Sequence, residues 1–395
     1  MLKVYKYDCI IVIILFLYDY IRKTYKIYRY HAKNIAKSVN ISYILGKGID
    51  KMVEVVTFGC RINAYESEVI KEKLKNYDKL IVVNTCAVTG EAERQCRQTI
   101  RKLKRENPDC EIIVTGCSAQ INSAKLADMK EVSLVLGNKE KKEIEKYVGG
   151  IFADKKQVSD IFADTGCDDY IITGFEGRQK AFVEIQQGCN HRCTYCIIPY
   201  ARGKNRSVPK EKIVAQIREL IDNGFKEICL TGVDICSYEP SFSDLVEYIL
   251  EKIPELPELN FGSLDPAAID EKFINLLHKY NNISSHFHLS IQSGDNEVLR
   301  RMGRRHKRED VIKLCQKIRR IRSEVRFGAD FICGFPEETV EQFNNTCKLV
   351  KETGLNKLHV FPYSERSGTP AAKMQQLPME ERRRRAAILR ELSEE

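Results

Sequence analysis

The sequence has little glycine and proline, and it has no long apolar run. It contains 22 Gly and 11 Pro among 395 residues, which is too few for collagen or for a low-complexity linker protein. The apolar run at residues 9–18 is too short for a bilayer span, which needs about 20 residues. No internal repeat of solenoid period is visible. With 43% hydrophobic and 30% charged residues, the chain is expected to form two or three globular domains.

The net positive charge is concentrated at the N-terminal end. Residues 1–51 hold ten basic and three acidic residues, whereas the rest of the chain holds 54 basic and 52 acidic residues. Any nucleic-acid partner therefore has to be inferred from local clusters rather than from global charge. No small-residue cleavage site follows the apolar run, which disfavours a signal peptide or anchor. We interpret residues 1–51 as an extension from a misassigned start, with Met52 as the expected initiator.

Cysteine, by contrast, is abundant, with 15 residues. The number is odd, the chain is long, and its Lys/Glu-rich helical segments are typical of intracellular proteins. A disulfide framework is expected in small secreted domains and not in such a chain. The cysteines are therefore better explained as ligands of a metal or a cluster, which their spacing can test.

From Met52 onward, short apolar runs alternate with helical patterns, which predicts parallel βα units. Residues 52–150 are expected to form the first domain. Its expected strands are residues 53–58, 80–83, 111–115 and 134–136, and its expected helices are residues 64–75 and 91–106. Residues 151–178 are weakly patterned and are interpreted as a linker.

A second series of units occupies residues 179–376. The expected strands are residues 181–185, 227–230, 260–262, 286–289, 326–332 and 357–360, and the expected helices are residues 209–222, 242–252, 269–279, 308–321 and 338–351. Six strands with intervening helices predict an incomplete (β/α)6 barrel, in which chemistry occurs at the C-terminal strand ends. Residues 377–395 are expected to form a charged helix. The predicted fold class is α/β, with an N-terminal parallel sheet followed by the barrel.

Three cysteines follow the first strand of the second series. Cys189, Cys193 and Cys196 have the spacing C-x3-C-x2-C. Zinc would need a fourth ligand, and His191 could supply it only with strain. Three thiolates suit a [4Fe-4S] cluster with one open iron, and that iron can chelate the amino and carboxylate groups of S-adenosylmethionine (SAM). The alternative is three buried free thiols.

Three more cysteines each end an expected strand of the first domain. Cys60 follows VEVVTFG, Cys86 follows LIVVNT and Cys117 follows EIIVTG. In a parallel sheet these thiols fall at the same C-terminal edge, where open α/β sheets bind ligands. Gly59 and Gly116 allow close backbone approach at two of them. A second cluster site is the natural interpretation, and the alternative is three ordinary small apolar residues.

Longer motifs carry a family resemblance. The chain resembles the methylthiotransferase family of radical SAM enzymes at TFGCRINAYES, VVNTCAVTGEAERQCRQTIRKLKRENPD, IIVTGCSAQ, GCNHRCTYCIIPYARGKNRSVP and LHVFPYSERSGTPAAKM. The resemblance extends from Val53 to the chain end. It is closest to tRNA N6-threonylcarbamoyladenosine (t6A) methylthiotransferases at RQTIRKLKRENP, CIIPYARG and FPYSERSGTPA. Close relatives act on N6-isopentenyladenosine in tRNA or on a ribosomal-protein aspartate, and bare spacing does not distinguish these substrates.

The resemblance implies a radical SAM tRNA methylthiotransferase (EC 2.8.4 type) with two [4Fe-4S] clusters and SAM. It places the SAM cluster on Cys189, Cys193 and Cys196 and an auxiliary cluster on Cys60, Cys86 and Cys117. A radical generated from SAM would remove hydrogen from C2 of the adenine beside the anticodon. The auxiliary cluster would bring the sulfur, with a methyl group from a second SAM. The other nine cysteines are expected to be packed small apolar residues.

Six further residues are candidates for SAM binding. They are Tyr195, Gly232, Asp234, Ser263, Ser290 and Gln292. Asp234 could accept from the SAM ammonium and Gly232 could admit the ligand, whereas the alternatives are loop packing, turns and ordinary strand-end polar groups. His286 and His288 share one strand face. They are expected to be a packed pair, and the alternative is that they point into the barrel. Relatives usually have Gly where this chain has Glu337, after Gly334-Phe335-Pro336.

Basic residues gather near two of the cysteine motifs. The candidates for RNA contact are Arg97, Arg101, Arg105, Arg202, Lys204 and Arg206. A third basic cluster consists of Arg300, Arg301, Arg304, Arg305, Lys307 and Arg308. Such clusters suit phosphate contacts, although each alone is more often a solvated face. The anticodon loop offers an unstacked base that can enter a pocket. Family members usually continue into an RNA-binding TRAM domain, and no strand series remains here to build one.

The favoured interpretation is therefore a cytoplasmic tRNA-modifying enzyme. Its expected partners are the tRNA anticodon loop, an electron donor such as a flavodoxin or ferredoxin, and a sulfur source, with no stable membrane partner. The alternatives are a methylthiotransferase for N6-isopentenyladenosine or for a ribosomal-protein aspartate, and a non-catalytic iron–sulfur or zinc protein that binds RNA. The barrel strand ends and Thr231-Gly232-Val233-Asp234 argue against a mere electron carrier, which needs no SAM pocket.

Overall fold

A computed structural model describes residues 53–167 and 170–392. The expectations for the apolar run at residues 9–18 and for a start at Met52 lie outside these residues. All described elements belong to the second of two compact units, Lys51–Glu395. Within the described part of the chain, no helix combines the length and apolar character that crossing a membrane requires.

Five parallel strands form the first sheet, in the order of the sequence. They are β1 (Glu54–Thr57), β2 (Leu80–Thr85), β3 (Glu111–Gly116), β4 (Leu134–Leu136) and β5 (Lys156–Gln157). The helices of this part are α2 (Arg61–Leu74), α3 (Gly90–Glu106), α4 (Cys117–Ile121) and α5 (Ser123–Ala127). Strand β2 is buried on both faces, as expected for a parallel strand. Its Ile81 and Val83 pack with Ile100 of α3, whereas Val82 packs with Ile70 of α2.

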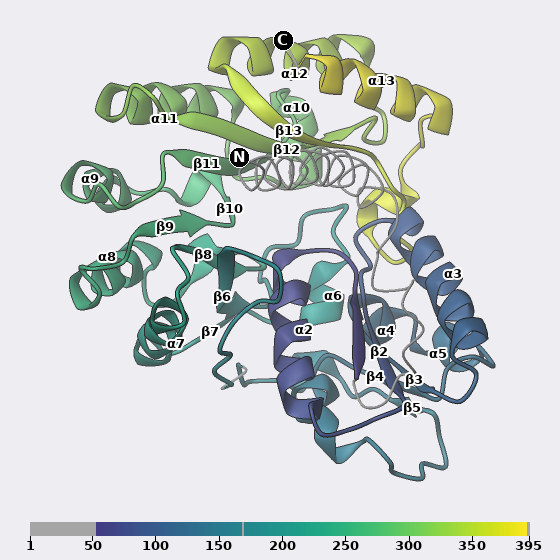
Figure 1. The fold of residues 1–395 in the computed structure, drawn as a ribbon. Helices are drawn as coiled ribbons and strands as arrows, with labels where there is room; N and C mark the ends of the chain where they lie inside the picture. Colours follow the sequence, from purple (N-terminus) through teal and green to yellow (C-terminus); the bar gives the residue numbers. More distant parts are fainter. Residues whose placement is uncertain (1–52, 168–169, 393–395) are drawn as a thin grey trace, which may run out of the picture. The chain divides into compact units, whose positions relative to one another are not determined.

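Six successive parallel strand positions and their helices form the second part (Figure 1). The strands are β6 (Lys180–Gln187), β8 (Glu227–Gly232), β9 (Glu258–Phe261) with β10 (Ser263–Leu264), β11 (His286–Gln292), β12 (Arg326–Cys333) and β13 (Leu355–Pro362). Gly262 separates β9 from β10, and the hydrogen-bonded strands accordingly form two sheets, one that ends at β9 and one that begins at β10. The short β7 (Arg206–Ser207) pairs antiparallel with β6. The predicted α/β class with an incomplete (β/α)6 barrel is confirmed.

Helices alternate with these strands. The five predicted helices are present as α7 (Lys210–Asp222), α8 (Phe242–Lys252), α9 (Glu271–Lys279), α11 (Arg308–Ile321) and α12 (Val340–Thr353). Helix α13 (Met379–Glu391) follows β13. Two short helices were not predicted from the sequence, α6 (Ile198–Arg202) and α10 (Asn296–Met302). Each is less than two and a half turns long, so neither contains enough apolar repeats to produce a helical period.

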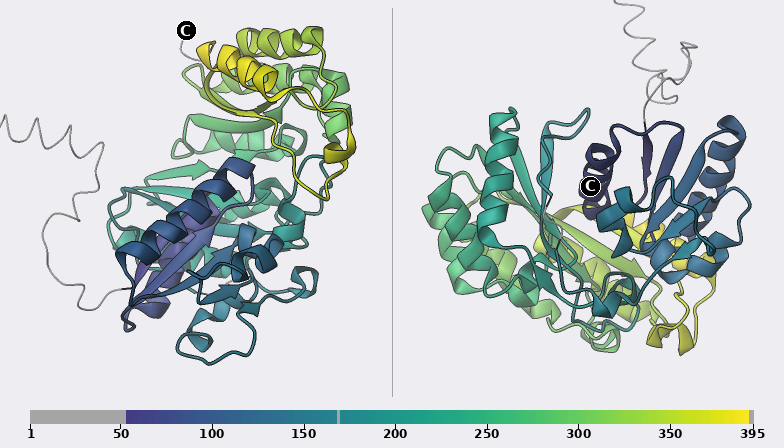
Figure 2. Two further views of the ribbon diagram at one scale, coloured as in Figure 1. Left: turned by 90° about the vertical axis from the view of Figure 1, so that its right-hand side faces the viewer. Right: turned by 90° about the horizontal axis from the view of Figure 1, so that it is seen from below.

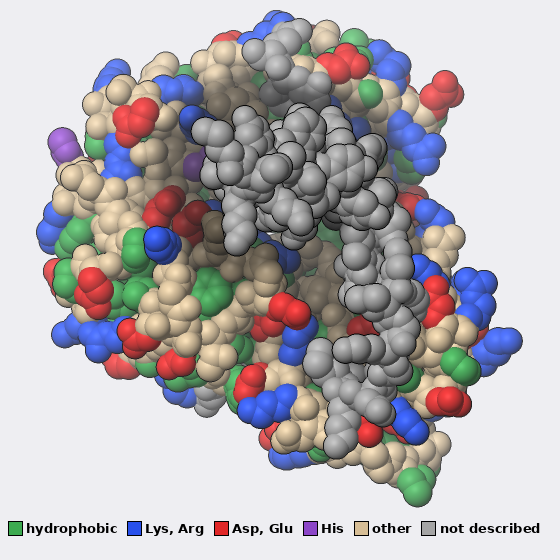
Figure 3. Space-filling view, in the orientation of Figure 1, with side chains coloured by type: hydrophobic (Ala, Val, Ile, Leu, Met, Phe, Trp, Pro, Cys, Tyr) green, Lys and Arg blue, Asp and Glu red, His purple; other side chains and the backbone are tan. Residues whose placement is uncertain are grey.

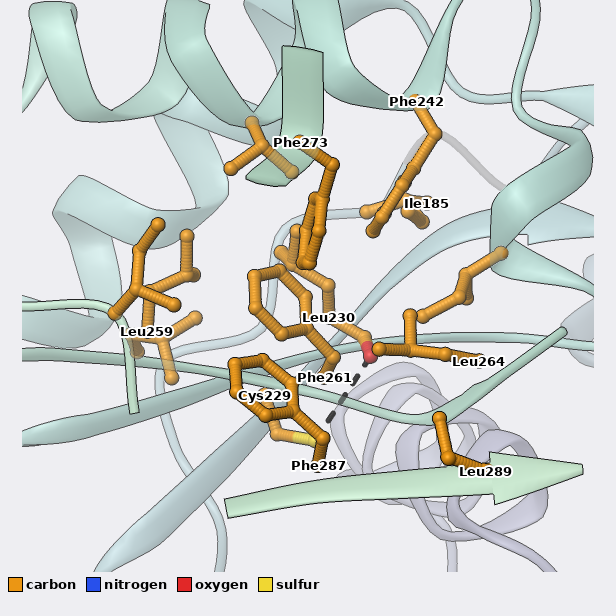
Figure 4. Packing of buried hydrophobic residues seen from close by; sticks show 14 of the residues in the cluster. Ile185, Cys229, Leu230, Phe242, Leu259, Phe261, Leu264, Phe273, Phe287 and Leu289 are labelled. Atoms are coloured by element: carbon orange, nitrogen blue, oxygen red, sulfur yellow. Dashed lines mark hydrogen bonds between the residues drawn. The ribbon is translucent and has the colours of Figure 1, made fainter. Parts of the chain in front are cut away.

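The core of the barrel part lies between its strands and the surrounding helices. Phe261 of β9 and Phe287 of β11 pack with Phe273 of α9 and Phe242 of α8 (Figure 4). The ring centroids of Phe261 and Phe273 are 5.4 Å apart. Burying each such ring contributes about 2–3 kcal/mol. Because side chains alternate along a strand, the residues next to each of these phenylalanines in its own strand face the inner side of the barrel.

Helix α2 packs against both the first sheet and the barrel. Its Ile70 belongs to the core of the first sheet, whereas its Tyr65 and Val69 belong to the core of the barrel. Arg61, in the first turn of α2, donates to the carbonyl of Phe261 at 3.4 Å. Figures 1 and 2 show α2 between the first sheet and strands β6 and β8. The helix that begins directly after Cys60 is therefore part of the barrel wall.

Candidate functional site

The structure brings Cys60, Cys86 and Cys117 to one edge of the first sheet. Cys60 precedes α2, Cys86 follows β2, and Cys117 is the first residue of α4. A Cβ atom at Gly59, whose φ is +96°, would lie 2.8 Å from both Cβ and Sγ of Cys86. Gly116 also has a positive φ, of +94°. These two glycines are therefore needed for the chain to fold at this edge, and their close approach places the Cys60 segment directly against Cys86.

These three thiols, which we call the auxiliary triad, suit a soft metal or a cluster. Cys60 is exposed, whereas Cys86 and Cys117 are buried. Burial raises the pKa of the Cys86 thiol to about 12, and the neighbouring Cys117 raises it further. A coordinated metal is what holds such a group as a thiolate. The all-sulfur donor set is the one that iron–sulfur clusters use, so the residues fit the expected group.

Arg202 lies at the centre of this edge. It comes from α6, which follows the second cysteine motif, and it is only 2% exposed. Its Nε lies 3.3 Å from Sγ of Cys117. Its Nη1 donates to Gln187 at 2.7 Å, and its Nη2 donates to Asn63 at 2.6 Å. Every nitrogen of the guanidinium is thus engaged inside the protein.

Glu66 is the charge partner of Arg202. The two side chains form a two-point contact with distances of 2.8 and 3.1 Å, and Lys141 pairs with the same carboxylate at 2.6 Å. Burial opposes ionisation of Glu66, but Arg202 and Lys141 outweigh it and hold the pKa of Glu66 well below its usual range. A buried carboxylate between two cations remains charged.

The RNA-contact prediction for Arg202 and Arg206 needs correction. Both are buried, and Arg206 donates to the carbonyls of Arg202, Lys204 and Gly166 and pairs with Asp164. The sequence shows a basic cluster after a cysteine motif, but it does not show the buried acceptors that use these guanidiniums. Lys204, between them, is exposed.

The second cysteine group, Cys189, Cys193 and Cys196, lies in the loop after β6, and we call it the SAM loop. All three thiols are free and partly buried. A Cβ atom at Gly188, whose φ is +69°, would lie 1.8 Å from the carbonyl oxygen of Lys204, so only glycine fits before Cys189. The backbone N–H of Cys189 donates to Gly203 at 3.1 Å. The SAM loop is thus held against the segment that follows α6.

Arg304 connects the SAM loop to β11. Its Nη1 lies 3.8 Å from Sγ of Cys193, and its Nη2 donates to the carbonyl of Ser290 at 2.7 Å. Tyr195 interacts with Cys193 and Arg304, and its ring packs in the apolar cluster of Met302. Burial, followed by the neighbouring Cys193, raises the pKa of Tyr195. Three sulfur donors with a cation beside them fit an anionic iron–sulfur cluster.

Asp234 contacts the SAM loop through His191. Its Oδ2 lies 2.9 Å from Nε2 of His191 and accepts from Ser237 at 2.6 Å. Gln186 Oε1 accepts the backbone N–H of Asp234 at 2.8 Å. A Cβ atom at Gly232 would lie 2.8 Å from that same Oε1. The glycine thus makes room for Gln186 in this structure.

The remaining predicted SAM residues lie in two places. Ser290 contacts Arg304 and donates to Leu264 at 3.2 Å, close to the SAM loop. Gln292, at the end of the same strand, has a φ of +74°. Ser263 is not with them, because it donates to Asp330 at 2.9 Å on the inner face of β12.

Sequence reasoning missed several residues of these sites. Arg304 looked like one of several surface cations, and Gln186 and Glu66 looked like ordinary polar positions in a strand and a helix. Spacing carries no signal for such residues, since Glu66 and Arg202 are 136 positions apart. Only a family-wide view of paired positions could have found them from sequence.

The two thiol sites are neighbours in space. Ile197, the residue after Cys196, packs in one buried cluster with Cys117, Ala87 and Ala201. The residue next to a SAM-loop cysteine in the sequence therefore packs in the same cluster as a cysteine of the auxiliary triad. The arrangement can bring chemistry begun at one site to the other.

A basic stripe runs along α3. Arg97, Arg101 and Arg105 recur every four residues, so they lie on one side of the helix. Arg101 and Arg105 are exposed and Arg97 is half-buried. Figure 3 shows Lys and Arg side chains along the edge where Figure 1 places α3. This stripe and Lys204 are the predicted RNA-contact residues that remain at the surface.

Two family models match the chain. The Radical SAM superfamily matches residues 183–350, and the Uncharacterized protein family UPF0004 matches residues 52–137. The first match contains the SAM loop, and the second contains the auxiliary triad.

Curated relatives match most of the chain. The threonylcarbamoyladenosine tRNA methylthiotransferase MtaB of Rickettsia prowazekii is 50% identical over 348 residues, covering 86% of this chain and 82% of the relative. MtaB of Bacillus subtilis is 35% identical and covers 81% and 75%. The tRNA-2-methylthio-N(6)-dimethylallyladenosine synthase of Halalkalibacterium halodurans is 33% identical and covers 87% and 68%.

Among solved structures, the radical S-adenosylmethionine methyltransferase TsrM from Kitasatospora setae, with cobalamin and a [4Fe-4S] cluster bound, is similar at a TM-score of 0.57. Its sequence identity is 16%, and the match covers 79% of this chain and 69% of that chain. This likeness shows the fold alone.

Proposed function

Because this chain belongs to the radical SAM tRNA methylthiotransferase family, we propose that it converts N6-threonylcarbamoyladenosine (t6A) beside the tRNA anticodon into its 2-methylthio derivative. The relatives with this printed activity reach 50% identity over most of the chain. The observation that carries the proposal is the buried cluster that Ile197, the neighbour of Cys196, shares with Cys117. It supports two thiol sites acting on one substrate.

The proposed cofactors are SAM and two [4Fe-4S] clusters. The SAM-loop cysteines would hold one cluster with SAM, and the auxiliary triad would hold the second. When bound, SAM and the cluster held by the SAM-loop cysteines would supply the radical chemistry for removing the C2 hydrogen, and the cluster held by the auxiliary triad would supply the sulfur, with the methyl group coming from a second SAM.

The chain's own residues position these groups. Gly188 and the hydrogen bond from Cys189 to Gly203 fix the path of the SAM loop. Arg304 places positive charge beside Cys193, and Arg202 places it beside Cys117. Both cations lower the cost of holding thiolates in a poorly hydrated site. Ile197 and Ala201 exclude water between the two thiol sites.

The tRNA is proposed to lie across the basic stripe of α3 with Lys204 nearby. Phosphate contacts by such exposed cations supply affinity and orientation. The modified adenine is turned out of the anticodon loop and enters the barrel. The reaction also needs a low-potential electron donor, for which a flavodoxin or ferredoxin is suitable, and a source that replaces the sulfur. With tRNA as substrate, the proposed compartment is the cytoplasm.

The first test is anaerobic reconstitution with iron and sulfide, followed by iron counting. We expect about eight irons per wild-type chain, and about four after Cys189, Cys193 and Cys196 are all replaced by Ala. Replacing Cys60, Cys86 and Cys117 should also leave about four. A wild type with about four irons, none of which survives loss of the SAM-loop cysteines, would remove the auxiliary site. Bound zinc in place of iron would favour a non-catalytic protein.

The second test is the substrate. Mass analysis of tRNA nucleosides, from cells with and without the enzyme, should show 2-methylthio-t6A only in its presence. Appearance of the 2-methylthio derivative of N6-isopentenyladenosine instead would assign the chain to the other tRNA branch. A methylthiolated ribosomal-protein aspartate would assign it to the protein-modifying branch.

A further inference from the structure

Four polar side chains that belong to neither thiol site meet on the inner face of the barrel. Asp330 of β12 lies at their centre. Its Oδ1 is 2.9 Å from Nε2 of His288 and 3.2 Å from Nδ1 of His359. Its Oδ2 accepts from Ser263 at 2.9 Å. The two imidazole rings are 4.5 Å apart, centroid to centroid.

Strand register explains why these residues share a face. Ser263 pairs with His288, and Asp330 pairs with His359, across parallel strands. Paired residues point to the same side of a sheet. The alternate residues Phe287 and Phe331 are fully buried in the core under the helices. The expectation that His286 and His288 form a packed pair is wrong for His288, which bonds to Asp330 instead.

His359 and Asp330 are open to solvent, and His359 has unused hydrogen-bonding capacity. The side chain of His359 is 47% exposed and that of Asp330 is 21% exposed. Each imidazole uses one ring nitrogen on Asp330. Among the described residues, Nε2 of His359 has no hydrogen-bond partner, whereas the side chain of His288 is only 4% exposed and its Nδ1 lies against Gly328. Burial opposes ionisation of Asp330, but hydrogen bonds from His288 and His359 outweigh it and hold its pKa well below the usual range. A fixed carboxylate of this kind orients the rings that flank it.

Two more residues of β13 extend the same face. Phe361 is two positions after His359 and is 42% exposed, which is unusual for an aromatic side chain. Lys357 is two positions before His359 and is also exposed, and no carboxylate among the described residues forms an ion pair with it. From the C-terminal end of β13 toward its N-terminal end, the face thus offers an aromatic ring, then imidazoles, then a cation.

The face is continuous with the SAM loop. Ser290 lies two residues after His288 on β11, and it contacts Arg304, which in turn contacts Cys193. Two residues along a strand span about 6–7 Å. That step is comparable with the distance from C2 of an adenine to the groups attached at its N6. A base with C2 near the SAM loop would therefore place its N6 substituent beside His288 and His359.

We propose that this inner face is the subsite that recognises the amino-acid substituent of the modified adenine. The inference rests on the proposed function, since it concerns the same base. Phe361 stacks on the base, Nε2 of His359 bonds the ureido group, and Lys357 pairs with the threonyl carboxylate. Asp330 and Ser263 hold the imidazoles in place. A hydrocarbon substituent would leave these polar groups unpaired, and a site built on hydrogen bonds rejects such analogues strongly.

The same three side chains, His288, Asp330 and His359, are also a conceivable ligand set for a divalent metal ion. Two imidazoles and a carboxylate suit zinc or iron(II). The exposed Phe361 and Lys357 favour the substrate, because neither an aromatic ring nor a cation assists metal binding.

The test compares two RNA probes on the anaerobically reconstituted enzyme. One probe is an anticodon stem–loop with t6A, and the other has N6-isopentenyladenosine at the same position. Dissociation constants are measured for the wild type, His359→Ala and Lys357→Ala. The matched control is Lys348→Ala, an exposed lysine on α12. A second readout is 5′-deoxyadenosine formation from SAM without RNA, which the variants should leave unchanged.

We expect each of the two inner-face variants to bind the t6A probe about 10- to 100-fold more weakly, with no change for the other probe or for the control variant. Equal weakening on both probes, or no weakening, would overturn the inference. One extra zinc or iron per chain that is lost in His359→Ala would overturn it in favour of a metal site. The affinity comparison needs no turnover, so a wild type that makes no methylthiolated product refutes the proposed reaction separately.

Discussion

Arg202 and Glu66 form a buried two-point ion pair between α6 and α2, with N–O distances of 2.8 and 3.1 Å. The arginine comes from the segment after the SAM loop, and the glutamate lies six residues after Cys60. The same guanidinium reaches Cys117. The pair therefore ties the barrel to the sheet at the edge that carries the auxiliary triad, and a change in it should affect stability and cluster retention together.

Replacing Arg202 by Met tests this link. The change leaves Glu66 with Lys141 and the Gln187 amide as its partners and removes the donor to Cys117, and breaking a buried pair of this kind costs about 3 kcal/mol. Chemical denaturation of the cluster-free protein should show this loss. After reconstitution, iron should fall toward the content of the triple auxiliary-triad variant.

Arg94→Met is the matched control for Arg202→Met, because Arg94 pairs with Glu91 in a fully exposed contact at 2.6 Å. It should change neither stability nor iron content measurably. Wild-type iron content in Arg202→Met would refute a role of this arginine at the auxiliary triad.

Glu66 gives the link a pH dependence. Burial would raise its pKa, but Arg202 and Lys141 hold the pKa below the usual value of 4.5. A carboxyl group with a lowered pKa in the folded state stabilises the protein above its unfolded-state pKa, and this contribution is lost as the pH falls below that value. The difference in melting temperature between wild type and Glu66→Gln should thus be constant from pH 8 to about 5 and shrink below about 4.5. A difference that grows as the pH falls would contradict the assignment.

The basic stripe of α3 should contribute to tRNA affinity through phosphates. Replacing Arg97, Arg101 and Arg105 by Gln should weaken binding, most strongly at low salt. The slope of log affinity against log salt should become shallower by about 2 to 3, as expected for three lost phosphate contacts. Lys272→Gln serves as a control, because Lys272 on α9 already pairs with Asp244 and Glu247. An unchanged slope in the triple variant would place the RNA elsewhere.

Glu337 occupies a backbone position that suits glycine. Its φ is +63°, in the left-handed region that costs a non-glycine residue about 1–2 kcal/mol. The resemblance leads us to expect Gly here in relatives, and the backbone conformation supplies a physical reason for that expectation. Glu337→Gly should raise the free energy of unfolding by about 0.5–1 kcal/mol, after the entropy cost of glycine. The same replacement at Glu341, in the first turn of α12, should lower it, and equal signs for the two variants would contradict the argument.

Much of this protein could be predicted from local patterns. Alternating apolar runs located β1 to β4 and the six barrel strand positions, because strand and helix periods depend only on neighbours in the sequence. The six motif cysteines were found in the same way, since each follows an apolar strand or falls within a short spacing. Glu337 was recognised as a departure, but only its positive φ in the structure supplies the physical reason.

By itself, the sequence determined the order of strands and helices and the two groups of three cysteines. Only the tertiary structure decided which polar residues act together. Arg202 and Arg206 resembled surface cations in the sequence, yet Glu66 and Asp164 bind them in the interior. Asp330 and His359 lie 29 positions apart and meet only because β12 and β13 pair in register. The physical reason is that a charge acquires its role from the groups that surround it after folding, and those groups come from distant parts of the chain.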